Sequence, residues 1–227
     1  MSEYGKKNYW DERYKNEKEP FDWYHKYAKV KDLLGSFIKT GDRILVIGCG
    51  NSDLSDGLYK SGFTNVDNID ISDVVIGQMV EKYKDRPGLT FTTMDVCNMD
   101  FLQASFDVII DKGTMDCVLC GSGSTTRAEK MCSEVSRILK KDGYYLIISH
   151  SKPPNRMHYI DKKAYGWKIN VDTIPKPIIK SIPQDNPHVY YFYACKKLVN
   201  EDDETEENLD EILDAEDDSE VNLESTI

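Results

Sequence analysis

Short apolar runs alternate along the chain with stretches in which apolar residues recur every three or four positions. The runs predict five strands, at residues 43–47, 66–70, 89–93, 106–111 and 144–149. The run RILVI at 43–47 is almost continuously apolar, which is typical of a strand buried on both faces of a parallel sheet. The pattern therefore predicts a fold built around β-strands.

Helical spacing fills the intervals between the predicted strands. Apolar residues three or four apart predict helices over residues 22–39, 51–61, 72–86 and 128–139. Ser72 can cap the third of these helices, and Pro87-Gly88 ends it. Strands that alternate with helices predict right-handed βαβ units, and hence a parallel sheet with helices on both faces.

The C-terminal part of the sequence breaks this alternation. The runs YGWKINV at 165–171 and HVYYFYACKK at 188–197 are strand-like, and prolines rather than a helical pattern separate them. They predict an antiparallel pair at the edge of the sheet. The predicted fold class is α/β: a Rossmann-like, mostly parallel sheet of seven strands with helices on both faces and a C-terminal antiparallel β-hairpin.

The formal net charge of −11 is concentrated at one end of the chain. Residues 201–224 hold 14 Asp and Glu and no Lys or Arg, which leaves 26 acidic against 29 basic residues elsewhere. We expect one folded domain over residues 1–199 and a disordered acidic tail over residues 200–227. Two interpretations of the tail stay open: a solubilising end, or an interaction segment for a basic partner.

The positions of the cysteines and of the apolar runs indicate in which cellular compartment the protein works. The six cysteines are scattered, and the CxxC formed by Cys117 and Cys120 has no second pair or nearby histidines at metal-ligand spacing. We therefore predict reduced, partly buried thiols and no metal site. The N-terminal residues MSEYGKKNYW have no apolar core of a secretory signal, and no run approaches the length of a membrane span. We expect a cytoplasmic protein that does not enter a membrane.

Two glycines follow the first predicted strand directly. Gly48 and Gly50 leave room for a ligand against the backbone, and Asn51 begins the next helix, whose free N–H groups favour polar ligand atoms. Asp70 ends the second strand, where a carboxylate suits the hydroxyls of a ribose. A dinucleotide fingerprint would place a third glycine where Asp53 stands, and this carboxylate would repel a pyrophosphate. The pattern favours a nucleoside cofactor without phosphates.

Carboxylates also follow the third and fourth predicted strands. Asp95 lies where it can accept from an adenine amino group, and Val96 can pack on the ring. Asp111, Lys112 and Asp116 lie beyond the fourth strand, toward the reactive end of such a cofactor. The alternative for these positions is an ordinary turn residue or a surface charge in a loop.

At these residues the sequence resembles a known family. The segments LVIGCGNSDLS, NIDIS and DKGTMD resemble class I S-adenosylmethionine-dependent methyltransferases, and YWDERYKNEKEPFDWY resembles the branch that methylates lysines of translation elongation factor 1-alpha. The resemblance covers residues 8–150. It implies S-adenosyl-L-methionine as cofactor, S-adenosyl-L-homocysteine as product and elongation factor 1-alpha as the protein substrate. We expect no direct binding of nucleic acid, and we expect a monomer.

The resemblance also implies roles for single residues. It implies that the N-terminal segment 1–40 covers the cofactor, and that Gly48 lies under its amino-acid part. The residues that it places around the cofactor are Trp10, Tyr14, Trp23, Gly48, Asp70 on the ribose, Ile71 on the adenine, Asp95 and Val96 at the adenine edge, and Lys112 through its backbone. Position alone adds Gly50, Asn51 and Asp111. We expect Asp111 or Asp116 to orient the acceptor amine.

The sequence departs from one group of methyltransferases in a motif that bears on the acceptor of the methyl group. The Asn/Asp-Pro-Pro-Tyr motif of methyltransferases that act on nucleobases or glutamine is replaced by Asp111-Lys112-Gly113. This weakens a nucleobase or amide nitrogen as the acceptor. The resemblance implies a protein lysine as the acceptor; the alternatives are a small molecule or a protein N-terminus as acceptor, and a non-catalytic cofactor-binding protein. The four histidines, His150 among them, are interpreted as packing or surface residues.

Overall fold

The computed structural model describes residues 3–177 and 188–199, so the predicted acidic tail at 200–227 lies outside the described residues. Within the described part, seven strands form one sheet in the order β3-β2-β1-β4-β5-β7-β6. The strands are β1 (Ile44–Ile47), β2 (Val66–Asp70), β3 (Leu89–Thr93), β4 (Phe106–Lys112), β5 (Leu139–Ser149), β6 (Trp167–Pro175) and β7 (Val189–Lys197). This arrangement confirms the predicted α/β fold.

The direction of the strands changes twice across the sheet, on either side of β7. Strands β1 to β5 pair in parallel, and β7 pairs antiparallel with both β5 and β6. The chain crosses from β3 at one edge to β4 beside β1, so the strand order reverses between β1 and β4. In open α/β sheets such a reversal opens a crevice beyond the carboxyl ends of the strands.

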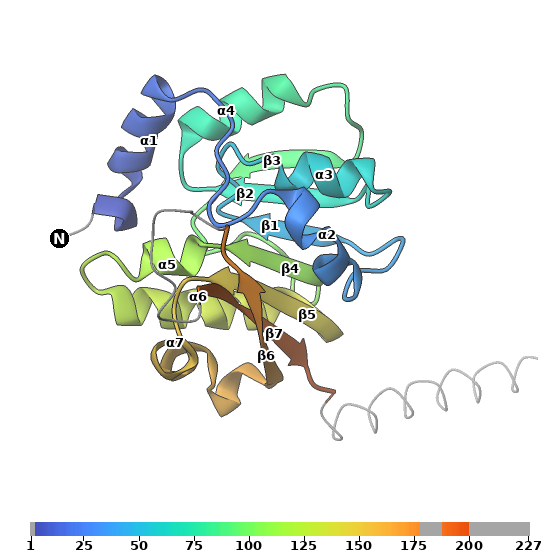
Figure 1. The fold of residues 1–227 in the computed structure, drawn as a ribbon, viewed down its shortest axis with the longest axis vertical. Helices are drawn as coiled ribbons and strands as arrows, with labels where there is room; N and C mark the ends of the chain where they lie inside the picture. Colours follow the sequence, from blue (N-terminus) through green and yellow to red (C-terminus); the bar gives the residue numbers. More distant parts are fainter. Residues whose placement is uncertain (1–2, 178–187, 200–227) are drawn as a thin grey trace, which may run out of the picture. The chain divides into compact units, whose positions relative to one another are not determined.

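Helices cover both faces of the sheet, as the alternation predicted (Figure 1). The longer helices are α1 (Lys7–Asn16), α2 (Tyr27–Gly35), α3 (Leu54–Lys60), α4 (Asp73–Lys82), α6 (Ser124–Ile138) and α7 (Pro153–Ile160), with α5 (Thr114–Val118) as a short one. Along β1, Ile44 and Val46 pack with α2, α3 and α4, whereas Leu45 and Ile47 pack with α5 and α6. Both sets are buried, which explains why the sequence of this strand is continuously apolar.

The prediction of a helix over residues 22–39 is wrong at both ends. Helix α2 covers only Tyr27–Gly35, and Tyr24 has a φ of 66°, a left-handed conformation that no helix contains. Trp23 matched the helical spacing, but it belongs to an extended segment that runs from α1 over the strand ends. Helix α5 and helix α7, which begins with two prolines, were not predicted.

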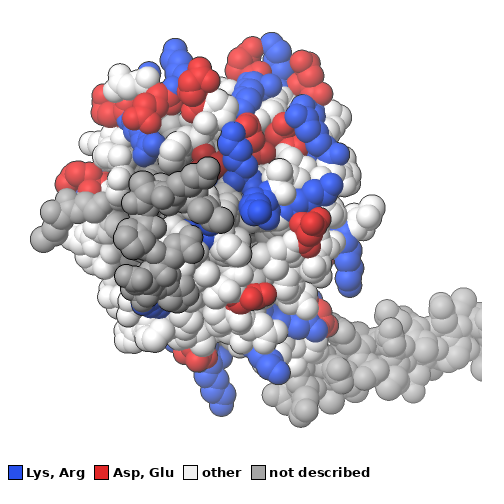
Figure 2. All heavy atoms as spheres, viewed as in Figure 1, with Lys and Arg blue, Asp and Glu red and all other residues white. Residues whose placement is uncertain are grey.

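Charges of both signs are interspersed over α2, α3 and α4 (Figure 2). Lys60 and Arg86 lie 2.7 and 2.9 Å from Asp56, and Lys82 lies 3.0 Å from Asp53. Exposed pairs of this kind contribute about 0–1 kcal/mol each. This face therefore carries paired charges rather than a field of one sign.

Candidate active site

The turn after β1 requires both of its glycines, and neighbouring side chains are the reason. Gly48 and Gly50 have φ values of 59° and 52°, in the left-handed region that favours glycine. A Cβ on Gly48 would lie 2.2 Å from Oγ1 of Thr114, and one on Gly50 would lie 2.7 Å from the hydroxyl oxygen of Tyr14. The sequence predicted close approach by a ligand; the structure adds close approach by two side chains.

Helix α3 begins later than predicted. It starts at Leu54, whose N–H donates to Oγ of Ser52. The Asn51 side chain is used elsewhere: its Nδ2 donates to the carbonyl of Glu19 at 2.7 Å, and its Oδ1 accepts from the N–H of Phe21 at 3.2 Å. Asn51 thus lines the pocket and also holds the extended segment that follows α1.

Asp70 is buried at the end of β2, next to the glycine turn. Its Oδ2 accepts from the N–H of Gly50 at 2.9 Å, and its Oδ1 accepts from the N–H of Ser72 at 3.0 Å. Burial raises the pKa of this carboxyl against the effect of these backbone hydrogen bonds. Each carboxylate oxygen has a second lone pair, so Asp70 can still accept from two ligand hydroxyls.

Asp95 and Val96 follow β3. The Asp95 carboxylate accepts from the N–H of Cys97 at 2.9 Å and lies 3.4 Å from the guanidinium of Arg127. Val96 is buried beside it. A turn role and a ligand role are therefore compatible at Asp95, because the backbone contact uses one oxygen.

Aromatic side chains of the N-terminal part form a wall around a cation. Trp10 and Tyr14 stack at 5.8 Å on α1, and the guanidinium carbon of Arg13 lies 5.7, 4.9 and 5.5 Å from the ring centres of Trp10, Phe21 and Trp23. Such distances favour cation–π attraction. Arg13 was not predicted as a site residue, although its spacing of three from Trp10 places both on one helix face.

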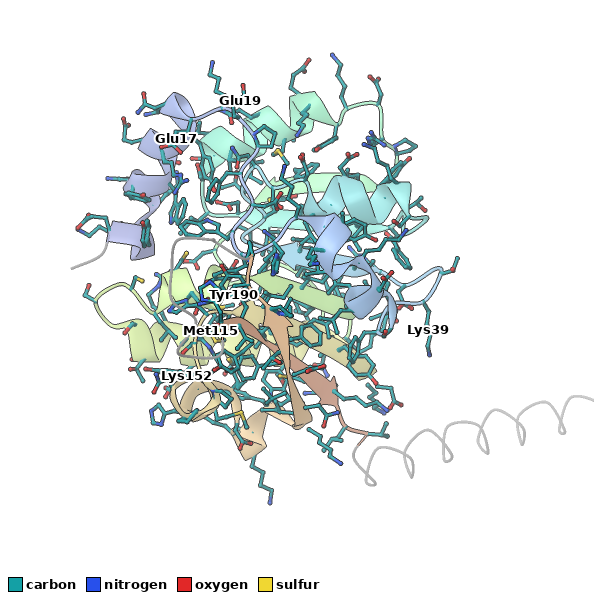
Figure 3. The ribbon with its side chains drawn as sticks, viewed as in Figure 1. Glu17, Glu19, Lys39, Met115, Lys152 and Tyr190 are labelled. Carbon is teal, nitrogen blue, oxygen red and sulfur yellow. The ribbon has the colours of Figure 1, made fainter. Side chains whose placement is uncertain are left out.

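A buried ion pair fixes the extended segment to β4. The ammonium of Lys112 donates to Oδ1 of Asp22 and to the carbonyl of Trp23, both at 3.0 Å. The side chains of Asp22 and Lys112 are 4% and 5% exposed, and Ser52 also donates to Asp22. Burial lowers the pKa of Lys112 more than Asp22 raises it. Figure 3 labels Glu17 and Glu19 at the start of this segment.

These elements enclose a pocket of about 980 Å³, including its mouth, at the carboxyl ends of β1, β2 and β4. All eleven residues expected to bind the cofactor line it: Trp10, Tyr14, Trp23, Gly48, Gly50, Asn51, Asp70, Ile71, Asp95, Val96 and Lys112. The two residues expected to act on the acceptor, Asp111 and Asp116, are not among the lining residues.

Asp111 has a structural position. It is fully buried, and its carboxylate accepts from the N–H groups of Thr114 and Met115 at the start of α5 and from the hydroxyl of Tyr145. Burial raises its pKa to about 6. Because these partners surround the carboxylate, we correct the expectation for Asp111: it organises the turn beneath the pocket rather than contacting an acceptor amine.

Asp116 lies in a second cluster, with Tyr24, Ser149, His150 and Arg156. Its carboxylate accepts from Tyr24 at 2.5 Å and from Ser149 at 2.8 Å, and it pairs with Arg156. The ring of His150 lies next to it. Sequence reasoning did not connect these residues: His150 was expected to be a packing or surface residue, and it lies at the surface in contact with Asp116 and Tyr24.

The comparisons with known proteins bear on the class of protein that this fold and pocket define. A family profile of the methyltransferase domain matches residues 45–147. The fold is similar to a solved S-adenosylmethionine-dependent methyltransferase of Methanosarcina mazei, with a TM-score of 0.57, 16% identity and coverage of 79% of this chain and 100% of that one. It is also similar to phosphoethanolamine N-methyltransferase 2 of Haemonchus contortus bound to S-adenosylhomocysteine (TM-score 0.56, 18% identity, 76% and 53% covered). The fold and pocket are those of an S-adenosylmethionine-dependent methyltransferase.

Curated relatives define the family more closely. The chain is 36% identical over 181 residues to EEF1A lysine methyltransferase 4 of Mus musculus, covering 75% of this chain and 71% of that protein. It is 37% identical over 207 residues to the eEF1A lysine and N-terminal methyltransferase of Homo sapiens, covering 86% of this chain but 29% of that protein. The chain belongs to the family of methyltransferases that contains EEF1A lysine methyltransferase 4.

Proposed function

We propose that this protein transfers a methyl group from S-adenosyl-L-methionine to a lysine amine of translation elongation factor 1-alpha. Its membership of the family supports the reaction, and the names of the relatives support the substrate. The observation that carries the proposal is the pocket. Residues from α1, the extended segment and the ends of β1, β2, β3 and β4 line one cavity.

The lining residues fit the parts of the cofactor. Asp70 has free lone pairs for the ribose hydroxyls, and Ile71 and Val96 offer apolar surface to the adenine. Asp95 can accept from the adenine amino group. Arg13 also lines the pocket, and its guanidinium matches the carboxylate of the amino-acid part in geometry and charge.

The chain's task is mainly to position the reactants. The bound cofactor supplies a methyl group on a sulfonium sulfur. A lysine amine with a pKa of about 10.4 is mostly protonated at neutral pH, so it must lose a proton before it can accept a methyl group. The aromatic wall of Trp10, Tyr14 and Trp23 gives the pocket an apolar lining, and an apolar site favours the neutral amine.

The proposal also assigns a role to each part of the chain. We propose that residues 1–199 act as the methyltransferase domain, that segment 1–40 covers the cofactor, and that the acidic residues 200–227 favour encounter with a basic substrate. We propose a monomer that works in the cytoplasm. Among the described residues, no helix is both long and apolar enough to cross a membrane.

The test is transfer of a labelled methyl group. The protein is incubated with methyl-labelled S-adenosyl-L-methionine and purified, unmodified elongation factor 1-alpha, and peptide mass spectrometry locates the label. We expect label on a lysine side chain. Label on the N-terminal amine would favour the second candidate function, which the name of the human relative supports. No label on the factor, with label in the small-molecule fraction of a lysate, would contradict a protein substrate.

A further inference from the structure

The second cluster contains an ordered chain of polar groups that ends at the surface. On one side of Asp116, Oδ1 accepts from Ser149 and from the guanidinium of Arg156. On the other side, the Tyr24 hydroxyl donates to Oδ2 at 2.5 Å. Nδ1 of His150 lies 3.2 Å from the Tyr24 hydroxyl oxygen and 3.4 Å from Oδ2.

The cluster holds Asp116 ionised although it is buried. Burial by itself would raise the pKa of this carboxyl, but the hydrogen bond to His150 and the charge of Arg156 outweigh it and lower the pKa. Tyr24 keeps its proton, because burial and the nearby charge of Asp116 both raise its pKa. The carboxylate is therefore an acceptor, and the phenol is its donor.

These protonation states decide which nitrogen of His150 carries the proton. The one proton of the Tyr24 hydroxyl is used on Asp116, so the hydroxyl oxygen can only accept from the imidazole. The neutral ring of His150 must then carry its proton on Nδ1 and leave a lone pair on Nε2. Within residues 3–177 and 188–199, no side chain or backbone group forms a hydrogen bond with Nε2, and the His150 side chain is 62% exposed.

The cluster adjoins the end of the pocket that lies away from the nucleoside residues. Tyr24 follows Trp23, which lines the pocket, and a Cβ on the lining residue Gly113 would lie 3.2 Å from the Tyr24 ring. Asp116 is next in sequence to Cys117, also a lining residue. Tyr190 of β7, labelled in Figure 3 near Met115 of α5, packs on Tyr24 with ring centres 4.6 Å apart.

We propose that His150 is the base that removes the proton from the acceptor lysine, with Asp116 and Tyr24 as the residues that position its ring. The inference rests on the proposed function, because it assigns the route of the proton in that reaction. Tyr24 joins this base to the pocket, because it contacts His150 on one side and lies against the pocket wall at Gly113 on the other.

The steps balance as follows. Nε2 of His150 takes one proton from the lysine ammonium, which gives a neutral amine and an imidazolium. The amine nitrogen then forms a bond to the methyl carbon as the carbon–sulfur bond breaks, so the positive charge passes from sulfur to nitrogen. The imidazolium returns its proton to water through its exposed face.

Charged groups on three elements set the titration of this base. The hydrogen bond that the His150 ring donates to Asp116 of α5 raises the pKa of His150 above its ordinary value, whereas burial, Arg156 of α7 and Lys176 after β6 lower it. The net shift is upward. Below this pKa the ring is an imidazolium that cannot accept a proton, so the rate of methyl transfer should fall as the pH falls through it.

The test compares His150→Gln with His158→Gln, an exposed histidine on α7 outside the cluster. Three quantities are measured: the imidazole tautomer of His150 in the unliganded wild-type protein by ¹⁵N NMR, the affinity for S-adenosyl-L-homocysteine by calorimetry, and kcat and KM against pH with purified elongation factor 1-alpha. We expect a neutral ring protonated on Nδ1, and unchanged cofactor affinity in both variants. We expect His150→Gln to lower kcat by about 100-fold or more and to remove the low-pH limb of the profile.

Each result either supports or overturns the role of His150 as the base. A neutral His150 ring protonated on Nε2 overturns the inference, and so does a His150→Gln variant whose kcat and pH profile match those of His158→Gln. Partial restoration of a His150→Ala variant by imidazole in the buffer would support it, because a purely structural loss is not repaired by free imidazole. Wild-type protein without any turnover of elongation factor 1-alpha overturns the proposed function, and this inference with it.

Discussion

The buried pair between Asp22 and Lys112 offers a direct way to perturb the cover of the pocket without touching its floor. Asp22→Asn keeps the shape of the side chain and removes its charge. Lys112 would then be a buried ammonium whose partners are an amide oxygen and the carbonyl of Trp23. Asp22 belongs to the extended segment, so losing the ion pair should weaken the packing of this segment against β4.

Two estimates give the free-energy cost of Asp22→Asn. Removing one partner of a buried pair costs about 3–5 kcal/mol. Lys112 can avoid an unmatched charge by losing its proton, and this costs about 4.6 kcal/mol at pH 7 for a reference pKa of about 10.4. Because the segment can open instead, the loss should appear as local opening over residues 17–26 and as an affinity for S-adenosyl-L-homocysteine lower by about 10- to 100-fold.

Hydrogen exchange measured by mass spectrometry, together with calorimetry, tests this reasoning. Asp85→Asn, at an exposed position, is the matched control. We expect faster exchange over residues 17–26 in Asp22→Asn, with the strands β1 and β4 unchanged. Wild-type exchange and affinity in this variant would show that the pair does not hold the segment, and faster exchange throughout the sheet would show that it supports the whole domain instead.

Three further predictions concern the floor of the pocket and the second cluster. Asp70→Ala should weaken S-adenosyl-L-homocysteine binding by about 1–3 kcal/mol, the scale for hydrogen bonds to a charged group, and unchanged affinity in calorimetry would contradict the ribose role. Gly48→Ala should lower the free energy of unfolding measured in urea by about 2–5 kcal/mol, because it adds a clash with Thr114 to the strain of a left-handed backbone. The control is Gly41→Ala, where φ is 94° and nothing lies near the new Cβ, and it should cost about 1–2 kcal/mol. Equal losses in the two variants would contradict the clash with Thr114. Asp116 raises the pKa of His150, so the protonated ring stabilises the fold below about pH 6.5, and this stability is lost as the pH rises through the raised pKa. His150→Gln should therefore lower Tm more at about pH 6 than at about pH 9. A loss of Tm that does not depend on pH would contradict this coupling between His150 and Asp116.

The floor of the pocket was predictable because it depends on local sequence and strand order. Parallel strands bring their carboxyl ends to one rim, so Gly48, Asp70 and Asp95, each placed just after a strand, had to lie near one another. The alternation of apolar runs with helical spacing was enough to predict that these strands are parallel. The apolar periodicity at α4 likewise placed its cap at Ser72, whose Oγ accepts from the N–H of Val75.

The cover of the pocket was not predictable in the same way. The contacts of Asp22 with Lys112 and of Tyr24 with His150 join residues 90 and 126 positions apart, and they depend on an extended segment with a left-handed residue in it. Trp23 matched the helical spacing of α2 and concealed this segment. Asp111 was misjudged for a related reason: a carboxylate after a strand can serve the start of the next helix as well as a ligand.

A structure of the protein with S-adenosyl-L-homocysteine would examine the proposed reaction most directly. We predict that the ligand occupies the cavity between the glycine turn and the aromatic wall, with its ribose hydroxyls on Asp70 and its thioether sulfur toward Gly113. A ligand bound elsewhere, or a cavity that stays closed by Trp10 and Trp23 at saturating ligand, would contradict the account.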